Sequence, residues 1–69
     1  MNRYIVAFIS FHDNVLTQEP MNAMNEYSAL EGLLLSKGME PYDDLKSVED
    51  LKDFAFDCEC MISAYKIAE

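Results

Sequence analysis

The stretch Arg3-Tyr-Ile-Val-Ala-Phe-Ile-Ser-Phe11 decides the fold of this chain. It is rich in β-branched and aromatic residues and contains neither Gly nor Pro, a composition typical of a β-strand. Alternate side chains of a strand point to opposite faces, and here both faces are largely apolar. One face would carry Ile5, Ala7, Ile9 and Phe11, and the other Tyr4, Val6, Phe8 and Ser10. Apolar residues on both faces favour a central strand rather than an edge strand.

A second strand is predicted after a short turn. Asp13 and Asn14 tolerate the left-handed conformations of tight turns, so they predict a hairpin. Residues 15–24 then alternate imperfectly between apolar and polar side chains. Because Pro20 has no N–H group to donate to a neighbouring strand, we expect this second strand at an edge of the sheet.

Two helices are predicted beyond the hairpin, separated by a loop over residues 39–46. Asn25 can cap the first, expected over 26–37, and Gly38 would end it. Ser47 can cap the second, with Asp50 three residues later as in a capping box. Apolar residues recur at helical spacing in both: Tyr27, Leu30, Leu33 and Leu34 in the first, and Val48, Leu51, Phe54 and Ala55 in the second. Gly32, inside the first helix, predicts close packing against the sheet.

The C-terminal segment fits two structures. The apolar stripe of the second helix continues to Tyr65, so one helix over 48–67 fits the pattern, but so does a strand over 58–67. The central character of the first strand favours the strand, because a two-stranded hairpin would leave one of its edges unpaired. We therefore predict an α+β fold in a single domain, residues 1–69, in which an antiparallel hairpin is packed by one or two helices and joined by a third, C-terminal strand.

Acidic residues dominate the second half of the chain. Eight carboxylates stand among residues 40–59 against two lysines, in a chain whose formal net charge is −8. Their negative field reaches about 8 Å into physiological salt. It disfavours nucleic acid and anionic membranes as direct partners, and it favours a protein with a basic surface.

The opening Tyr4-Ile-Val-Ala-Phe-Ile-Ser-Phe-His-Asp-Asn-Val-Leu16 resembles the start of a group of small acidic bacteriophage proteins. In that group an aromatic strand ending in Ser-Phe-x-Asp-Asn-x-Leu precedes a second strand, an acidic helix and a closing strand. The helix start here reads Asn25-Glu-Tyr-Ser-Ala-Leu30, and Pro20 departs from the usual pattern of the second strand. The resemblance implies a strand-strand-helix-helix-strand order and a phage accessory role, but it carries over no functional residues.

These observations lead to a hypothesis of a non-enzymatic phage protein that inhibits a host protein. The target would be a defence, restriction, CRISPR or transcription component, and the acidic face could imitate nucleic-acid phosphates. Tyr42 and Phe56 have no evident place in a core, so they are candidate apolar anchors among the carboxylates. The expected partner-binding residues are Glu40, Tyr42, Asp43, Asp44, Glu49, Asp50, Asp53, Phe56 and Asp57. The same segment also fits a solvated surface that keeps a small domain soluble.

Two alternatives differ in class from this hypothesis. A homo-oligomer could sequester a small signalling molecule between subunits, although an anionic ligand would need Arg or Lys at its pocket. The available cations are Arg3, Lys37, Lys46, Lys52 and Lys66. The chain could also be a structural homodimer without a dedicated target.

Metal, cofactor and catalytic chemistry find little support in the sequence. His12, Cys58 and Cys60 lack the spacing of a zinc site, so we expect the two cysteines to be buried, reduced thiols. No calcium loop or phosphate-binding glycine loop is present, and a single histidine leaves few parts for acid–base catalysis. We therefore expect no metal, no cofactor and no enzymatic activity. Without a visible targeting segment, the expected location is the cytoplasm of the host cell.

Overall fold

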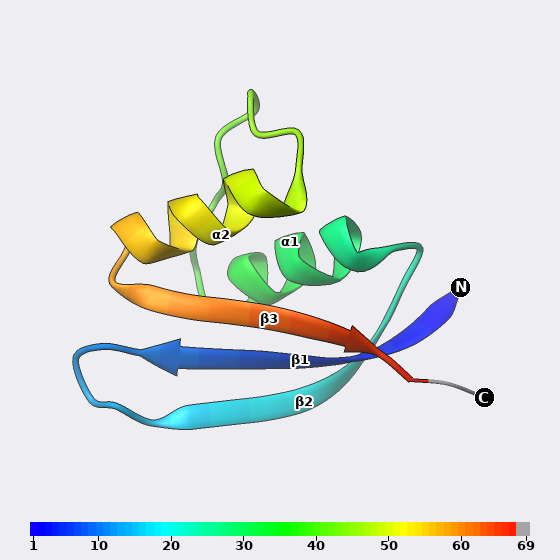
Figure 1. Cartoon of the computed structure of the whole chain (residues 1–69), viewed down its shortest axis with the longest axis horizontal. Helices are drawn as coiled ribbons and strands as arrows, with labels where there is room; N and C mark the ends of the chain where they lie inside the picture. The colour runs from blue at the N-terminus through cyan, green and yellow to red at the C-terminus, as the bar shows by residue number, and fades with distance from the viewer. Residues whose placement is uncertain (68–69) are drawn as a thin grey trace.

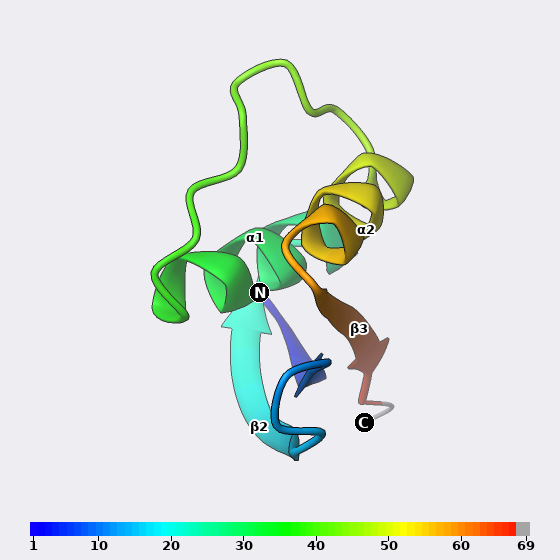
Figure 2. The ribbon, with the colours of Figure 1, turned by 90° about the vertical axis from the view of Figure 1, so that its left-hand side faces the viewer.

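Three antiparallel strands form one sheet, and both helices pack on the same side of it (Figure 1, Figure 2). The computed structural model describes residues 1–67. Its elements in chain order are β1 (Asn2–Ser10), β2 (Leu16–Ala23), α1 (Glu26–Ser36), α2 (Val48–Asp57) and β3 (Cys60–Lys66). The sheet order β2-β1-β3 confirms the α+β prediction, with β1 in the centre and the Pro20-containing β2 at an edge.

The C-terminal segment is a strand, so the alternative of one helix over 48–67 is wrong. α2 ends at Asp57, and Glu59 adopts a left-handed conformation with φ 63° between the helix and β3. This reversal lets β3 return along β1, where Ser10 pairs with Cys60 and Tyr4 with Lys66. The central strand thereby gains the second neighbour that its composition predicted.

The capping signals in the sequence are used as expected. The side chain of Asn25 accepts a hydrogen bond from the Ser28 amide (2.8 Å) at the start of α1. Ser47 accepts one from the Asp50 amide (3.2 Å) at the start of α2. Each bond satisfies a backbone donor that has no partner within its helix. Gly38, with φ +80°, follows α1, which ends one residue earlier than predicted.

The core lies between the helices and one face of the sheet. Val6, at the centre of β1, is fully buried beneath the leucines of α1 and α2. A Cβ atom at Gly32 would lie 3.1 Å from Sδ of Met21 on β2, so this glycine permits the predicted close approach of α1 to the sheet. The buried residues of this core are Tyr4, Val6, Ala23, Ala29, Leu30, Leu33, Leu34, Leu51, Ala55, Cys60, Ile62 and Ala64.

The other face of the sheet has no helix over it (Figure 2). We call this surface the open face, and it consists of the strand residues that alternate with the core residues. The strand register places these residues side by side: Arg3, Ile5, Ala7 and Ile9 from β1, Leu16, Gln18, Pro20 and Asn22 from β2, and Met61, Ser63 and Tyr65 from β3.

No helix within residues 1–67 is both long and apolar enough to cross a membrane.

Candidate functional site

The acidic loop between the helices is fixed to the fold at Leu45. The Tyr27 hydroxyl on α1 donates a hydrogen bond to the Leu45 carbonyl oxygen (2.8 Å), and the Leu45 side chain packs against the core. The loop stands on the helix side of the sheet, beyond α1 and α2 (Figure 1, Figure 2). Its position beside α2 is therefore set by a long-range contact that the sequence pattern did not reveal.

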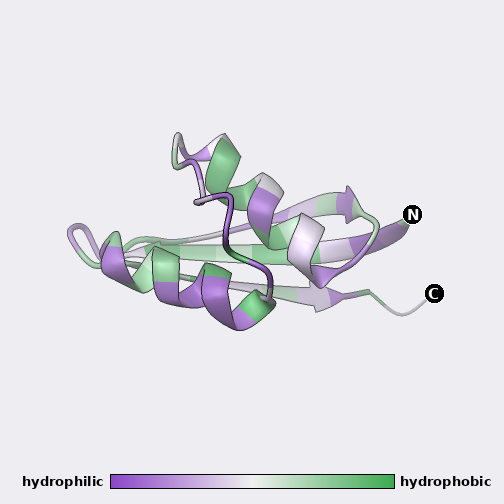
Figure 3. Ribbon diagram, turned by 90° about the horizontal axis from the view of Figure 1, so that it is seen from above, coloured by the Kyte–Doolittle hydropathy of each residue, from purple (hydrophilic) through white to green (hydrophobic). Residues whose placement is uncertain are grey.

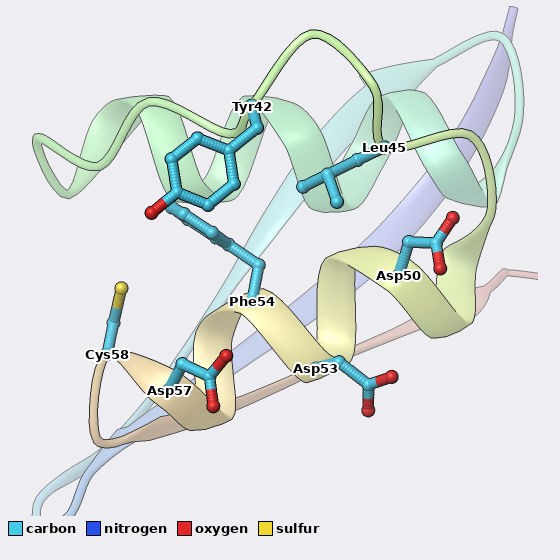
Figure 4. A pocket seen from close by; sticks show the side chains of 7 residues that line it. All are labelled: Tyr42, Leu45, Asp50, Asp53, Phe54, Asp57 and Cys58. Carbon is cyan, nitrogen blue, oxygen red and sulfur yellow. The ribbon is translucent and has the colours of Figure 1, made fainter.

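Two aromatic rings meet between this loop and α2. Tyr42 and Phe54 pack edge to face, with ring centroids 5.2 Å apart and planes at 81°. They border a groove of about 250 Å³ that also has Leu45 at its floor (Figure 4). We call this hollow the acidic groove; its lining residues are Tyr42, Leu45, Asp50, Asp53, Phe54, Asp57 and Cys58.

Three carboxylates of α2 line the acidic groove. Asp50, Asp53 and Asp57 follow one another at intervals of three and four residues, so they lie on one side of the helix. Figure 4 shows them in a row along α2, beside the aromatic pair. Hydrophilic and hydrophobic residues alternate along this helix (Figure 3), as expected when one side covers a sheet and the other faces solvent.

Asp50 also has a structural role. Its carboxylate accepts a hydrogen bond from the Lys46 backbone amide (3.1 Å), and its own amide donates to Ser47. The backbone hydrogen bond from Lys46 lowers the pKa of Asp50. Asp53 and Asp57 remain exposed on the next two turns, where they are open to a binding partner.

The negative charge of this side of the molecule is not paired internally. Among the described residues, the one close contact between a carboxylate and a basic side chain joins His12 to Glu59, at the end of the sheet. Neither lysine of the acidic segment lies within 4.0 Å of a carboxylate oxygen, as far as residues 1–67 show. The field of the acidic groove therefore extends into solvent.

The structure separates the predicted binding residues into groups. Tyr42, Asp50, Asp53 and Asp57 lie together in the acidic groove. The remaining carboxylates are exposed but do not line it: Glu40, Asp43 and Asp44 on the loop, and Glu49 on α2.

Phe56 lies apart from Tyr42. Its ring packs edge to face against Phe11, with centroids 5.6 Å apart, and lines a second hollow with Met61 of β3. A residue two positions along a helix points about 200° away, so Phe54 faces the groove while Phe56 faces the β3 edge. The two expected anchors, Tyr42 and Phe56, therefore do not form one surface patch.

Sequence reasoning missed two contributors to the acidic groove. Phe54 was assigned to the core stripe of α2; it is half-buried and does pack on the core, but its ring also meets Tyr42. Cys58 was expected to be buried, yet it is exposed at the end of the groove. The residue after the last helical turn leaves the apolar stripe, and this exposes the thiol.

Cys60 fits the expectation of a buried thiol. Its Sγ lies 3.2 Å from the Ala55 carbonyl oxygen, and burial raises the pKa of the thiol. His12 contacts Glu59 rather than either cysteine. Over residues 1–67, no cluster of three or more His, Cys, Asp or Glu side chains is arranged to hold a metal ion.

The acidic groove has the features of a receptor for a basic side chain. The apolar stem of a Lys or Arg can lie along aromatic rings, while its cationic group interacts with ring faces and carboxylates. Comparisons of the chain with family models, curated proteins and solved structures find no match.

Proposed function

We propose that this chain is a non-enzymatic binding protein that inhibits a host protein by covering a basic surface on it. The observation that carries the proposal is the acidic groove, in which unpaired carboxylates of α2 border the Tyr42–Phe54 aromatic pair. Carboxylates give specificity for cations and accelerate association, and the rings supply the apolar contact that charge alone lacks.

The contact would extend beyond the groove to the other exposed acids. Glu40, Asp43, Asp44 and Glu49 surround it on the loop and on α2, which enlarges the negative field. A surface that normally binds nucleic acid is lined with Lys and Arg, so such a field would compete with phosphates for it. The resemblance of residues 4–16 to phage proteins agrees with a host target of this kind.

The acidic groove argues against the alternative of a sponge for an anionic signalling molecule. Its lining includes three carboxylates and, among the described residues, no Lys or Arg, so it would repel a nucleotide. We therefore propose this side of the molecule as a protein-binding surface rather than as a nucleotide-binding site.

The test uses the full chain as bait in a bacterial lysate at low and high salt. A captured protein is then purified and its Kd measured against the natural chain, D53N/D57N and the control E19Q/E31Q. Both variants remove two negative charges, but Glu19 lies on β2 and Glu31 on α1. We expect D53N/D57N to weaken binding about 10-fold and to reduce the salt dependence, with little change in the control.

Two results would contradict the proposal. If both variants weaken binding equally, the captured protein responds to net charge and not to the acidic groove. If neither variant changes Kd or its salt dependence, this side of the molecule does not make the contact.

A further inference from the structure

The open face presents large apolar side chains to solvent. Leu16, Met61 and Tyr65 keep 57%, 56% and 64% of their surface exposed, although they lie on regular strands. The register joins them through Ile9, which pairs with both Leu16 and Met61, and through Ile5, which pairs with Tyr65. These side chains form two apolar groups that cross the strands, Leu16–Ile9–Met61 and Ile5–Tyr65, and the row Gln18–Ala7–Ser63 lies between them.

The strand residues that make up the open face, all within the described residues 1–67, include no acid. Their only formal charge is Arg3, whereas the chain carries 13 carboxylic side chains in total. Those of the described residues lie elsewhere: on the helices, on the loops, on the turn of the hairpin, and on the opposite face of β2, where Glu19 pairs with Val6. The loop and α2, which form the acidic groove, lie on the helix side of the sheet (Figure 2), although Asp53 of the groove and Met61 of the open face share the hollow at the β3 edge.

We propose that the open face binds the open face of a second copy of this chain, forming a two-fold symmetric dimer. Two molecules of net charge −8 repel each other, and contacts through helices or loops would bring their carboxylates together. Contact through the open faces buries apolar side chains and keeps the acids on the outer sides. The residues of this surface include no carboxylate and one formal charge, Arg3, so two copies can meet here in an isologous contact without bringing acids together.

The size of the open face is sufficient for a modest interface. Strands lie about 4.8 Å apart and rise about 3.3 Å per residue, so three strands of seven to nine residues cover roughly 400 Å². Two copies would bury about 800 Å² before the relief of the side chains is added, which lies in the range of weak, transient interfaces and below the ~1,200 Å² of stable ones. We therefore expect a reversible dimer with a Kd on the order of micromolar.

Packing of two sheets face to face would give the dimer a defined shape. Aligned sheets pack about 10 Å apart, with side chains of the inner faces interleaved. The two acidic grooves would then face outward in opposite directions. This inference does not depend on the proposed function, because none of the open-face residues lines the acidic groove.

Sedimentation equilibrium of the full chain from about 1 µM to about 1 mM tests the dimer, with L16R and L35R as a matched pair. Leu16 lies on the open face and Leu35 on α1, and they are similarly exposed, at 57% and 53%. Each substitution lowers the negative charge by one, which by itself would favour association. We expect L16R to raise the dimer Kd at least about 10-fold, because it places a charge in an apolar contact, and L35R to leave Kd unchanged or slightly lower.

The salt dependence of binding distinguishes the dimer from the proposed contact with a basic partner. Screening reduces the repulsion between two acidic copies, so the dimer should strengthen as salt is added. Binding of a basic partner to the acidic groove should weaken under the same conditions.

Three outcomes would overturn the dimer. The chain could remain monomeric over the whole concentration range at high salt, or L35R could disrupt association as strongly as L16R. Alternatively, Y65R on β3 could dissociate the dimer while L16R on β2 has no effect, which would indicate pairing of β3 edges instead of contact between open faces.

Discussion

The two faces of the sheet are built from the same three strands, yet they differ in what covers them. One face lies under α1 and α2 and contains the fully buried Val6, while the other leaves Leu16 and Tyr65 more than half exposed. Two short helices connected on one side of a sheet cannot also cover the other side. The apolar residues of this chain therefore exceed what its own helices can bury.

The same contrast applies to charge. The helix side carries the acidic groove and the acidic loop, whereas the open face carries one arginine and no carboxylate. Polar groups and charges are thus distributed unequally about the plane of the sheet. The helix side is suited to a cationic partner, and the open face is suited to an apolar one.

The largest difference between the two sides should appear in stability. Leu30 is fully buried on α1, so Leu30→Ala should lower the free energy of unfolding by about 3 kcal/mol, through lost burial and a residual cavity. Leu16→Ala on the open face should change it by less than about 0.5 kcal/mol in the monomer. Urea unfolding at low protein concentration measures both. Equal losses would mean that the open face is part of the monomer core.

Removal of a tyrosine hydroxyl should also affect stability differently on the two sides of the sheet, by a smaller amount. Tyr27→Phe removes the hydrogen bond to the Leu45 carbonyl and should lower the free energy of unfolding by about 1 kcal/mol. Tyr65→Phe, on the exposed end of the open face, should have almost no effect. Amide hydrogen exchange provides the second readout, because Tyr27→Phe should increase exchange in the loop before α2 and leave the sheet unchanged. A variant as stable as the natural chain would show that this bond does not fix the loop.

The N-cap of α2 should contribute a comparable amount. Ser47→Ala leaves the Asp50 amide without its side-chain acceptor, which costs about 1 kcal/mol at a helix start. Ser63→Ala, at a half-buried position on the open face, is the matched control and should change stability by a few tenths of a kcal/mol. Thermal unfolding of both variants gives the comparison. A larger effect at Ser63 would assign a structural role to the open face.

The smallest predicted effect is a pH dependence confined to the helix side. The hydrogen bond from the Lys46 amide favours the charged carboxylate of Asp50 and lowers its pKa below the ordinary value of 3.8. A depressed folded-state pKa stabilises the protein above pH 3.8, and this stabilisation is lost as the pH falls through the lowered value. The stability difference between the natural chain and Asp50→Asn should therefore narrow below about pH 4. Unfolding curves at several pH values would contradict this if the difference stayed constant.

Much of the local structure was predictable because short-range chemistry determines it. Hydrogen bonds or backbone angles within a few residues determine several features. These are the caps at Asn25 and Ser47, the end of α1 before Gly38 and the edge position of the strand that contains Pro20. The end of α2 was not predictable from periodicity, since the helical stripe continues through Met61, Ile62 and Tyr65, and strand alternation fits residues 58–67 as well. The left-handed conformation at Glu59 and pairing with β1 end the helix and form β3.

The candidate site was predicted only in part. Tyr42, Asp50, Asp53 and Asp57 come together as a surface, because three of them share one side of a helix. Phe54 was expected only in the core, while Phe56, expected as an apolar anchor among the carboxylates, packs against Phe11 and does not line the groove. The hydrogen bond from Tyr27 on α1 to Leu45 holds the loop in its position beside α2. It joins residues that are 18 apart in the sequence, so no local pattern predicts it.

Side-chain patterns alone indicate the first two strands, the start of each helix, the central place of residues 3–11 and the concentration of acids in the second half. Each of these follows from side-chain alternation, capping and composition, which act over a few residues. Only the tertiary structure decided which apolar face of β1 lies under the helices, which ring meets Tyr42, and that the acids and the open face lie on opposite sides. Those outcomes depend on the pairing of distant strands and on the direction of the connections, so they arise only when the whole chain folds together.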